Sequence, residues 1–272
     1  MNGAPVSGAG AGFDGLSGAT PPHSEGRPPD GVRTIPREAP GATRIVLVRH
    51  GEAVCNVSGI CGGPAGCRGL TELGREQVAI LHDRLSATGE LRGASAFYAS
   101  VLPRAIETAT GIAAALSNDA GAEPALVTEC DLCELHPGEA DGLSWEEFTA
   151  AFGGPDWDRD PAQPIAPGGE SWTGFVRRVA AMLDVLAARH PGELVVVATH
   201  AGVVEASLLA KVPVDGGLDG ARLQLRTAHT SLTTWEVGAG RWRLLSYNDA
   251  AHLVDPARGS RARDARPAAQ QA

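Results

Sequence analysis

Two short apolar runs restrict the fold of this chain more than any other feature of its sequence. Residues 44–48 read Arg-Ile-Val-Leu-Val, and residues 194–198 read Leu-Val-Val-Val-Ala. Runs of this length without polar alternation are typical of strands that are buried on both faces of a parallel sheet. Each run ends in a polar turn that contains a histidine, Arg-His-Gly-Glu at 49–52 and Thr-His-Ala-Gly at 199–202.

Extended and helical patterns alternate along the rest of the chain. We expect strands at 97–100 and 125–130, helices at 71–87, 102–116, 172–190 and 203–210, a short helix opened by a capping box at Ser144, and a hairpin of 230–237 with 242–247. Alternation of this kind predicts an α/β protein with a largely parallel sheet. The terminal hairpin predicts a mixed sheet edge.

Glycine and proline divide the chain into folded and unfolded parts. Sixteen of the first 41 residues are Gly or Pro. This segment has too few large apolar residues to offset the conformational entropy that it would lose on folding. We therefore expect residues 1–42 to form a disordered arm and residues 254–272 a disordered tail. The folded domain is expected at 43–253, with a variable cap segment at about 140–170.

Charge and cysteine content exclude several classes of protein. The formal net charge of −9 argues against a nucleic-acid partner, and no apolar run approaches the roughly 20 residues that span a bilayer. The arm lacks the basic and apolar regions of a secretory signal, and five cysteines is an odd number. We therefore expect a cytoplasmic protein whose cysteines are small buried thiols and not metal ligands.

The two histidines are expected to meet in one site. Sites in open α/β sheets lie outside the carboxyl ends of the strands, where His50 and His200 both fall. Arg49 precedes His50, and Arg104 opens the helix that follows strand 97–100. A guanidinium matches phosphate oxygens and disfavours a metal cation, and Asn56 can donate its amide to an anion. The pattern predicts an anion pocket that contains a nucleophile.

The segment Leu-Val-Arg-His-Gly-Glu at 47–52 resembles the signature of the histidine phosphatase superfamily, the phosphoglycerate mutase-like enzymes. The resemblance covers about residues 43–253 and implies a three-layer α/β/α sandwich with a mostly parallel mixed sheet. The other segments that resemble the family, in order, are 70–77, 100–109, 132–138, 168–171, 198–203 and 248–253.

The resemblance also implies an activity, that of a metal-independent phosphomonoesterase acting on a small phosphorylated metabolite. His50 would attack phosphorus and form a phosphohistidine, while Arg49, Arg104 and His200 would hold the phosphoryl oxygens. No cofactor and no metal is implied, because these groups supply the positive charge.

The remaining roles follow from the same resemblance. Glu134 would protonate the leaving oxygen and then activate water; it matches the family's Leu-x-Glu pattern better than its rival Glu129. Asn56, Gly51 and Ala201 complete the substrate-binding set. Glycines at 51 and 202 and in the loop 59–69 are expected where the backbone approaches the phosphoryl group.

Several neighbouring residues are expected to have structural roles. They are Glu52 and His136 (surface or loop-shaping), Glu139 and Asp141 (structural), and the aromatic residues of the cap (packing, with one or two stacking on substrate as the alternative).

Two alternatives to hydrolysis of a metabolite stay open. One is mutase-type phosphoryl transfer, which is disfavoured because only a short stretch follows Glu134 where mutases of the family carry a long insertion. The other is a phosphoprotein phosphatase or a regulatory binding module. The expected partner is a small phosphate ester, with no nucleic acid and no membrane; a homodimer stays open.

Overall fold

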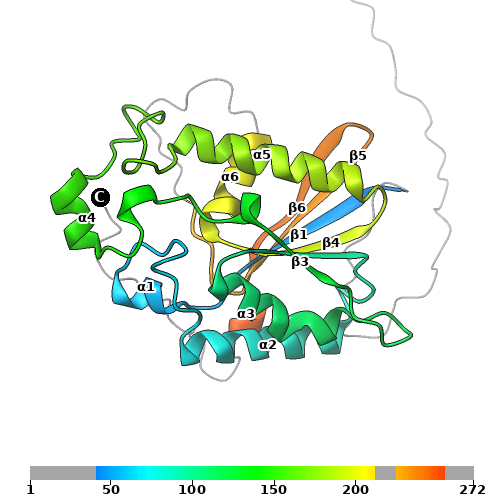
Figure 1. Cartoon of the computed structure of the whole chain (residues 1–272). Coiled ribbons are helices and arrows are strands. Elements are labelled where there is room, and N and C mark those ends of the chain that lie inside the picture. Colours follow the sequence, from blue (N-terminus) through cyan, green and yellow to red (C-terminus); the bar gives the residue numbers. More distant parts are fainter. Residues whose placement is uncertain (1–40, 212–224, 255–272) are drawn as a thin grey trace, which may run out of the picture. The chain divides into compact units, whose positions relative to one another are not determined.

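The computed structural model describes residues 41–211 and 225–254 (Figure 1). The predicted arm and tail lie outside the described residues, apart from residues 41, 42 and 254.

A six-stranded sheet forms the centre of the described part, in the order β3-β2-β4-β1-β5-β6. Strand β1 pairs in parallel with β4, β4 with β2, and β2 with β3, whereas β5 is antiparallel to both β1 and β6. This arrangement confirms the mostly parallel, mixed sheet with a hairpin at its edge. The strand bounds are β1 Thr43–Arg49, β2 Ala96–Ser100, β3 Leu126–Glu129, β4 Leu194–Thr199, β5 Leu232–Gly238 and β6 Arg241–Asp249.

The predicted helices are present, with small changes at their ends. Their bounds are α1 Val54–Ser58, α2 Glu72–Thr88, α3 Pro103–Ile112, α4 Trp145–Phe152, α5 Trp172–Arg189 and α6 Ala201–Lys211. The helix expected at 102–116 continues after α3 as a 3-10 turn, Ala113–Leu116. Helix α1 was not expected, because five residues are too few for a periodic pattern.

Local capping explains where the longer helices begin. The hydroxyl of Thr71 accepts a hydrogen bond from the Gly74 N–H at the start of α2, and Ser171 accepts one from Gly174 at the start of α5. Ser144 and Glu147 form the predicted capping box of α4. These side chains satisfy N–H groups that have no partner within the helix.

Helices cover both faces of the sheet (Figure 1). Alternate residues of β1 point to opposite faces, so Val46 and Val48 pack with α2 and α3, whereas Ile45 and Leu47 pack with α5 and α6. Because both faces are buried at the centre of the sheet, strands β1 and β4 contain mostly apolar residues. The structure thus has the expected α/β/α layers.

The cap segment packs around its own aromatic residues. Phe148 of α4 is buried against Trp145, Phe152 and Ile165. The Asp141 carboxylate accepts hydrogen bonds from the backbone N–H groups of residues 65 and 66, at 2.8 and 2.9 Å. Asp141 therefore joins the cap to the loop after α1, which is the structural role expected of it.

Within residues 41–211 and 225–254, no helix is both long enough and apolar enough to span a bilayer.

Candidate active site

The parallel pairing of β1 with β4 brings His50 and His200 together. Arg49 lies opposite Thr199 in the register, and the His50 N–H donates to the Thr199 carbonyl at 2.9 Å. The two imidazole rings, both buried, have centroids 5.1 Å apart. The two turns therefore form one site, as the sequence predicts.

Hydrogen bonds fix the tautomer of His50. Its Nδ1 lies 2.6 Å from the carbonyl oxygen of Gly51. A carbonyl only accepts, so Nδ1 carries the proton and Nε2 keeps its lone pair. The Arg104 Nε donates to this Nε2 at 3.2 Å. His50 thus presents an unprotonated nitrogen next to a buried guanidinium.

The surroundings keep both histidines neutral. Burial lowers the pKa of His50 well below its usual value, and the charges of Arg104 and then His200 and Arg49 lower it further. Burial, followed by Arg104 and Arg49, lowers the pKa of His200 in the same way. A neutral imidazole is the form that can act as a nucleophile.

The two ring nitrogens of His200 have no hydrogen-bond partner among the described residues. Both nitrogens are buried. Because buried polar atoms are almost always hydrogen-bonded in folded proteins, this ring is suited to a ligand. The nitrogen that carries the proton can donate to an anion.

Two arginines supply the positive charge. Arg104, at the start of α3, is 4% exposed and donates from one terminal nitrogen to the Gly62 carbonyl at 2.7 Å. No carboxylate of the described residues forms an ion pair with Arg104. Arg49 donates to the Thr227 carbonyl and lies 2.9 Å from Nε2 of His229. The buried guanidinium of Arg104, which has no carboxylate partner among the described residues, favours an anionic ligand.

The carboxylate of Glu134 lies beside the start of α6. Its Oε2 accepts from the Gly202 N–H at 3.1 Å, two residues after His200, and its Oε1 accepts from Leu135 at 3.3 Å. A Cβ at position 202 would come within 2.1 Å of Oε1. The glycine therefore makes room for this carboxylate. Glu129, the rival acid, ends β3.

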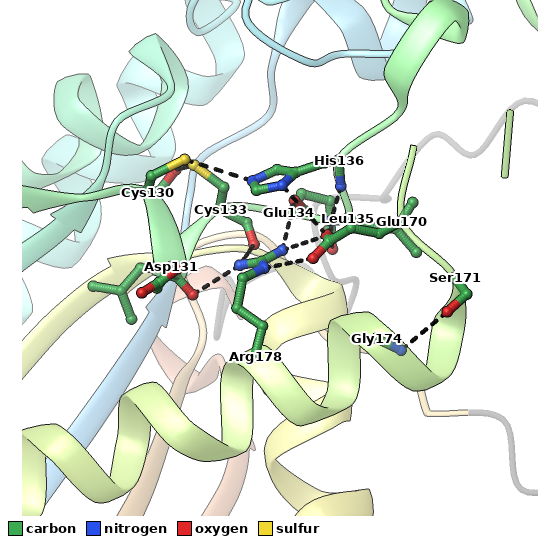
Figure 2. Close-up of polar contacts among 12 residues, drawn as sticks. Cys130, Asp131, Cys133, Glu134, Leu135, His136, Glu170, Ser171, Gly174 and Arg178 are labelled. Atoms are coloured by element: carbon green, nitrogen blue, oxygen red, sulfur yellow. Dashed lines mark hydrogen bonds and ion pairs between the residues drawn. The ribbon is translucent and has the colours of Figure 1, made fainter. Parts of the chain in front are cut away.

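Arg178 of α5 fixes the segment that carries Glu134 (Figure 2). It donates to the carbonyl groups of Asp131, Cys133 and Glu134 at 2.8, 3.1 and 3.3 Å. It also forms a two-point ion pair with Glu170, at 2.8 and 2.7 Å. The segment is therefore attached to α5 through three carbonyls and is not a free loop.

His229 is a third histidine of the site that the sequence did not indicate. Its ring centroid lies 5.9 Å from that of His50, and it is buried. Residues 225–231 bring it there, where the Thr230 N–H donates to the Arg49 carbonyl at 2.9 Å. His229 is far from His50 in the sequence and lies in the segment just before β5. No local sequence pattern therefore predicts that it belongs to the site.

Three residues expected to bind substrate have other contacts in this structure. The Asn56 Oδ1 accepts from the Ala53 N–H at 3.1 Å, within the first turn of α1. The Gly51 N–H donates to Thr108 at 3.1 Å, and Ala201 is the first residue of α6.

The glycines near His50 serve close backbone packing. A Cβ on Gly51 would lie 2.5 Å from the Gly74 carbonyl oxygen, and one on Gly62 would lie 2.6 Å from the Cys55 sulfur. These contacts give the glycines a packing role; the expectation that their backbone approaches a phosphoryl group stays a prediction. For Gly202 the explanation is the carboxylate of Glu134.

Glu52 and His136 shape loops, one of the two roles expected of them. Glu52 is buried and accepts from the Thr71 hydroxyl at 2.8 Å. The His136 N–H donates to the Glu170 carboxylate at 2.9 Å. The cysteines are all free, and four are buried as expected, but Cys130 is exposed.

Comparison with known proteins agrees with the geometry. The family model of the histidine phosphatase superfamily (branch 1) matches residues 45–250. A metal-independent phosphoserine phosphatase of Arabidopsis thaliana is 31% identical over 218 residues, 78% of this chain and 83% of that protein.

Two solved structures share the fold. Bacillus stearothermophilus YhfR matches with a TM-score of 0.62 and 29% identity, over 78% of this chain and 99% of that one. A mycobacterial glucosyl-3-phosphoglycerate phosphatase complexed with VO3 matches with a TM-score of 0.58 and 27% identity, over 75% and 98%.

The neutral histidines predict how stability depends on pH. Between the lowered folded-state pKa and about 6.5, an imidazole binds a proton in the unfolded chain but not in the folded one. Above about pH 6.5 these histidines therefore do not make the free energy of unfolding depend on pH. Below it, we expect a loss of up to about 1.4 kcal/mol per pH unit for each of His50 and His200.

Urea unfolding in phosphate-free buffers at pH 7.5, 6.5 and 5.5 measures this effect. His200→Gln should remove the contribution of one histidine to the fall in the free energy of unfolding below about pH 6.5. His82→Gln, which lies outside the site, should show the same fall as the wild type. Equal slopes for His200→Gln and wild type would contradict the prediction.

Proposed function

The chain belongs to the histidine phosphatase superfamily, and we propose that it is a metal-independent phosphomonoesterase that hydrolyses a small phosphorylated metabolite through a phosphohistidine at His50. The observation that carries this proposal is the state of the His50 ring. Its Nδ1 is held on the Gly51 carbonyl and its unprotonated Nε2 faces Arg104.

In the first step, His50 is the nucleophile. Nε2 attacks phosphorus in line, the bond from phosphorus to the ester oxygen breaks, and Glu134 gives its proton to that oxygen as the alcohol leaves. The products are the free alcohol, a phosphohistidine and a Glu134 carboxylate. The Gly51 carbonyl stabilises the imidazole during attack, because it accepts from the Nδ1–H that becomes more acidic.

In the second step, Glu134 is the base. Its carboxylate takes a proton from water, the water oxygen bonds to phosphorus, and the bond from Nε2 to phosphorus breaks. Inorganic phosphate leaves, and His50 and Glu134 return to their starting states. The Gly202 and Leu135 N–H groups hold the carboxylate in place for both proton transfers.

Arg104, Arg49 and His200 stabilise the charge on the three phosphoryl oxygens. Two observations support this assignment: the guanidinium of Arg104 is buried, and the ring nitrogens of His200 make no hydrogen bond within the described part of the chain. Arg49 has the same proposed role. In the structure without substrate it contacts the Thr227 carbonyl and His229, and it would exchange these contacts for phosphoryl oxygens. Asn56, Gly51 and Ala201 complete the binding set, with the Asn56 Nδ2 as a donor.

Small substrates are supported by two observations. The cap segment 140–170 packs onto the loop after α1, where the Trp145 N–H donates to the Gly59 carbonyl at 2.9 Å, and this loop also supplies the Gly62 carbonyl that Arg104 contacts. The relatives at 31% and 27% identity carry names that specify small phosphate monoesters. The five free cysteines support a reducing compartment, the cytoplasm.

The first prediction from this mechanism concerns turnover without metal. The protein should release phosphate from p-nitrophenyl phosphate in excess EDTA, because no step uses a metal. His50→Ala should lose at least about 10³-fold in kcat, with its thermal unfolding retained. Loss of wild-type turnover in EDTA, or activity in His50→Ala, would overturn the proposal.

The second prediction separates the two roles of Glu134. In the first step, p-nitrophenolate is a stable anion and can leave without a proton from Glu134. In the second step, the attacking water still needs Glu134 as a base. Glu134→Gln should therefore give a burst of about one p-nitrophenol per chain, then a slow phase about 10² to 10⁴-fold below wild type, with phosphate trapped on His50.

Glu129→Gln is the matched control and should turn over like the wild type without a burst. If Glu129→Gln gave the burst instead, Glu129 would be the acid. If neither gave it, the assignment of an acid and base in this segment would be wrong.

The third prediction concerns substrate class. In a panel of phosphorylated amino acids, sugars, glycerates, nucleotides and phosphopeptides, the highest kcat/KM should fall on a small metabolite. We expect it to exceed that of the best phosphopeptide by at least about tenfold, which is about 1.4 kcal/mol of transition-state binding. A phosphopeptide as the best substrate would favour the phosphoprotein phosphatase, and net transfer between glycerate phosphates would favour the mutase.

A further inference from the structure

We propose that Cys130, Cys133 and His136 form a zinc-binding site within the segment that carries Glu134. One sulfur or nitrogen atom from each of the three residues lies within 4.8 Å of the other two. Figure 2 shows the two sulfurs beside the imidazole. This group shares no residue with the phosphoryl site.

The spacing fits a tetrahedral metal. Zn–S and Zn–N bonds of about 2.3 and 2.0 Å place neighbouring ligand atoms about 3.5 to 3.8 Å apart. The Cys130 sulfur already lies 3.6 Å from the His136 Nε2. The remaining separations are at most 4.8 Å, and small rotations of the Cys130 and His136 side chains, which are both partly exposed, would close them.

Local structure puts the two cysteines on the same side of the chain. Residues 130–132 form a 3-10 turn, and the Cys133 N–H donates to the Cys130 carbonyl at 2.9 Å. A turn with this bond brings side chains three residues apart next to each other. The Ser100 hydroxyl donates to the Cys133 sulfur at 3.2 Å.

The histidine is oriented for a metal. Its backbone N–H donates to Glu170 at 2.9 Å, and its carbonyl accepts from the Glu170 N–H at 2.9 Å. The Glu170 carboxylate lies 3.6 Å from the ring Nδ1, so Nε2 is left to face the sulfurs. A carboxylate behind the far nitrogen of the ring is the usual arrangement around a metal-bound histidine.

The charges of the site balance with zinc bound. Two thiolates neutralise Zn²⁺, and the Glu170 carboxylate behind the histidine is already paired with Arg178. Zinc is favoured over calcium or magnesium, because thiolate and imidazole are soft or borderline ligands. Cys130 is exposed and the His136 side chain is 37% exposed, so the metal can enter and water can take the fourth position.

Zinc at this site would connect three residues that bracket Glu134, whose own carboxylate is bound at Gly202 and Leu135. The metal would thus stiffen the segment that carries the acid. That consequence rests on the role proposed above for Glu134, whereas the binding site itself does not.

Metal binding to the full-length chain tests the site directly. The protein is reduced with a phosphine, stripped with EDTA, desalted and titrated with Zn²⁺ and, separately, with Co²⁺. We expect one tightly bound zinc per chain, a thiolate-to-cobalt charge-transfer absorption, and a rise in Tm on addition of zinc. Cys130→Ser and His136→Gln should each weaken binding by at least about tenfold and remove or reduce the absorption.

Two variants control for metal bound elsewhere. Cys61→Ala removes a buried cysteine outside the cluster, and His200→Gln alters the phosphoryl site; both should bind zinc like the wild type. Cys130→Ser should also keep its turnover in EDTA, because Cys130 takes no part in the phosphoryl chemistry.

The site is refuted if zinc does not bind, if cobalt shows no thiolate absorption, or if binding is lost in His200→Gln and kept in Cys130→Ser. None of these results depends on phosphatase turnover. Failure of the zinc site and failure of the proposed function are therefore distinguishable.

Discussion

Strands β1 and β4 run side by side and in register, with Arg49 opposite Thr199, and the chain leaves both strands at the same edge of the sheet. The bond from the His50 N–H to the Thr199 carbonyl extends this pairing by one residue. A slip of one residue would turn every buried side chain of the strand to the opposite face. The apolar core thereby fixes the relative positions of His50 and His200.

Around that pair, burial and positive charge act together. Arg104 is buried beside His50, and both histidines are neutral because a further positive charge there is unfavourable. A buried guanidinium without a carboxylate partner is itself costly. The same cost makes the pocket favourable for an anion, even though the whole chain is acidic.

The acid of the proposed reaction is held by an independent set of contacts. Arg178 connects helix α5 to the carbonyls of residues 131, 133 and 134 and to Glu170, and Glu170 pairs with His136. This network positions Glu134 from one side, while Gly202 positions its carboxylate from the other. The same network contacts the carbonyl of Cys133 and the backbone and ring of His136, so the proposed zinc site and the proposed acid share part of their hydrogen-bond network.

The sequence predicted most of the fold, because its strongest signals are local. The apolar runs at 44–48 and 194–198 and the caps at Thr71, Ser144 and Ser171 depend on neighbours within a few residues. It also indicated the two histidines and Arg104, since strand ends and helix starts share one edge of such a sheet. It missed the early end of α3, where a 3-10 turn replaces the last helical residues.

Long-range contacts decided the rest. His229 reaches His50 only because the chain returns from α6 to β5, and the glycines at 51 and 202 are explained by the Gly74 carbonyl and the Glu134 carboxylate. The sequence by itself determined the strands, the helices and the residues at their ends. Only the tertiary structure decided which side chains face one another, because those contacts join residues up to 180 positions apart and depend on the packing of the whole domain.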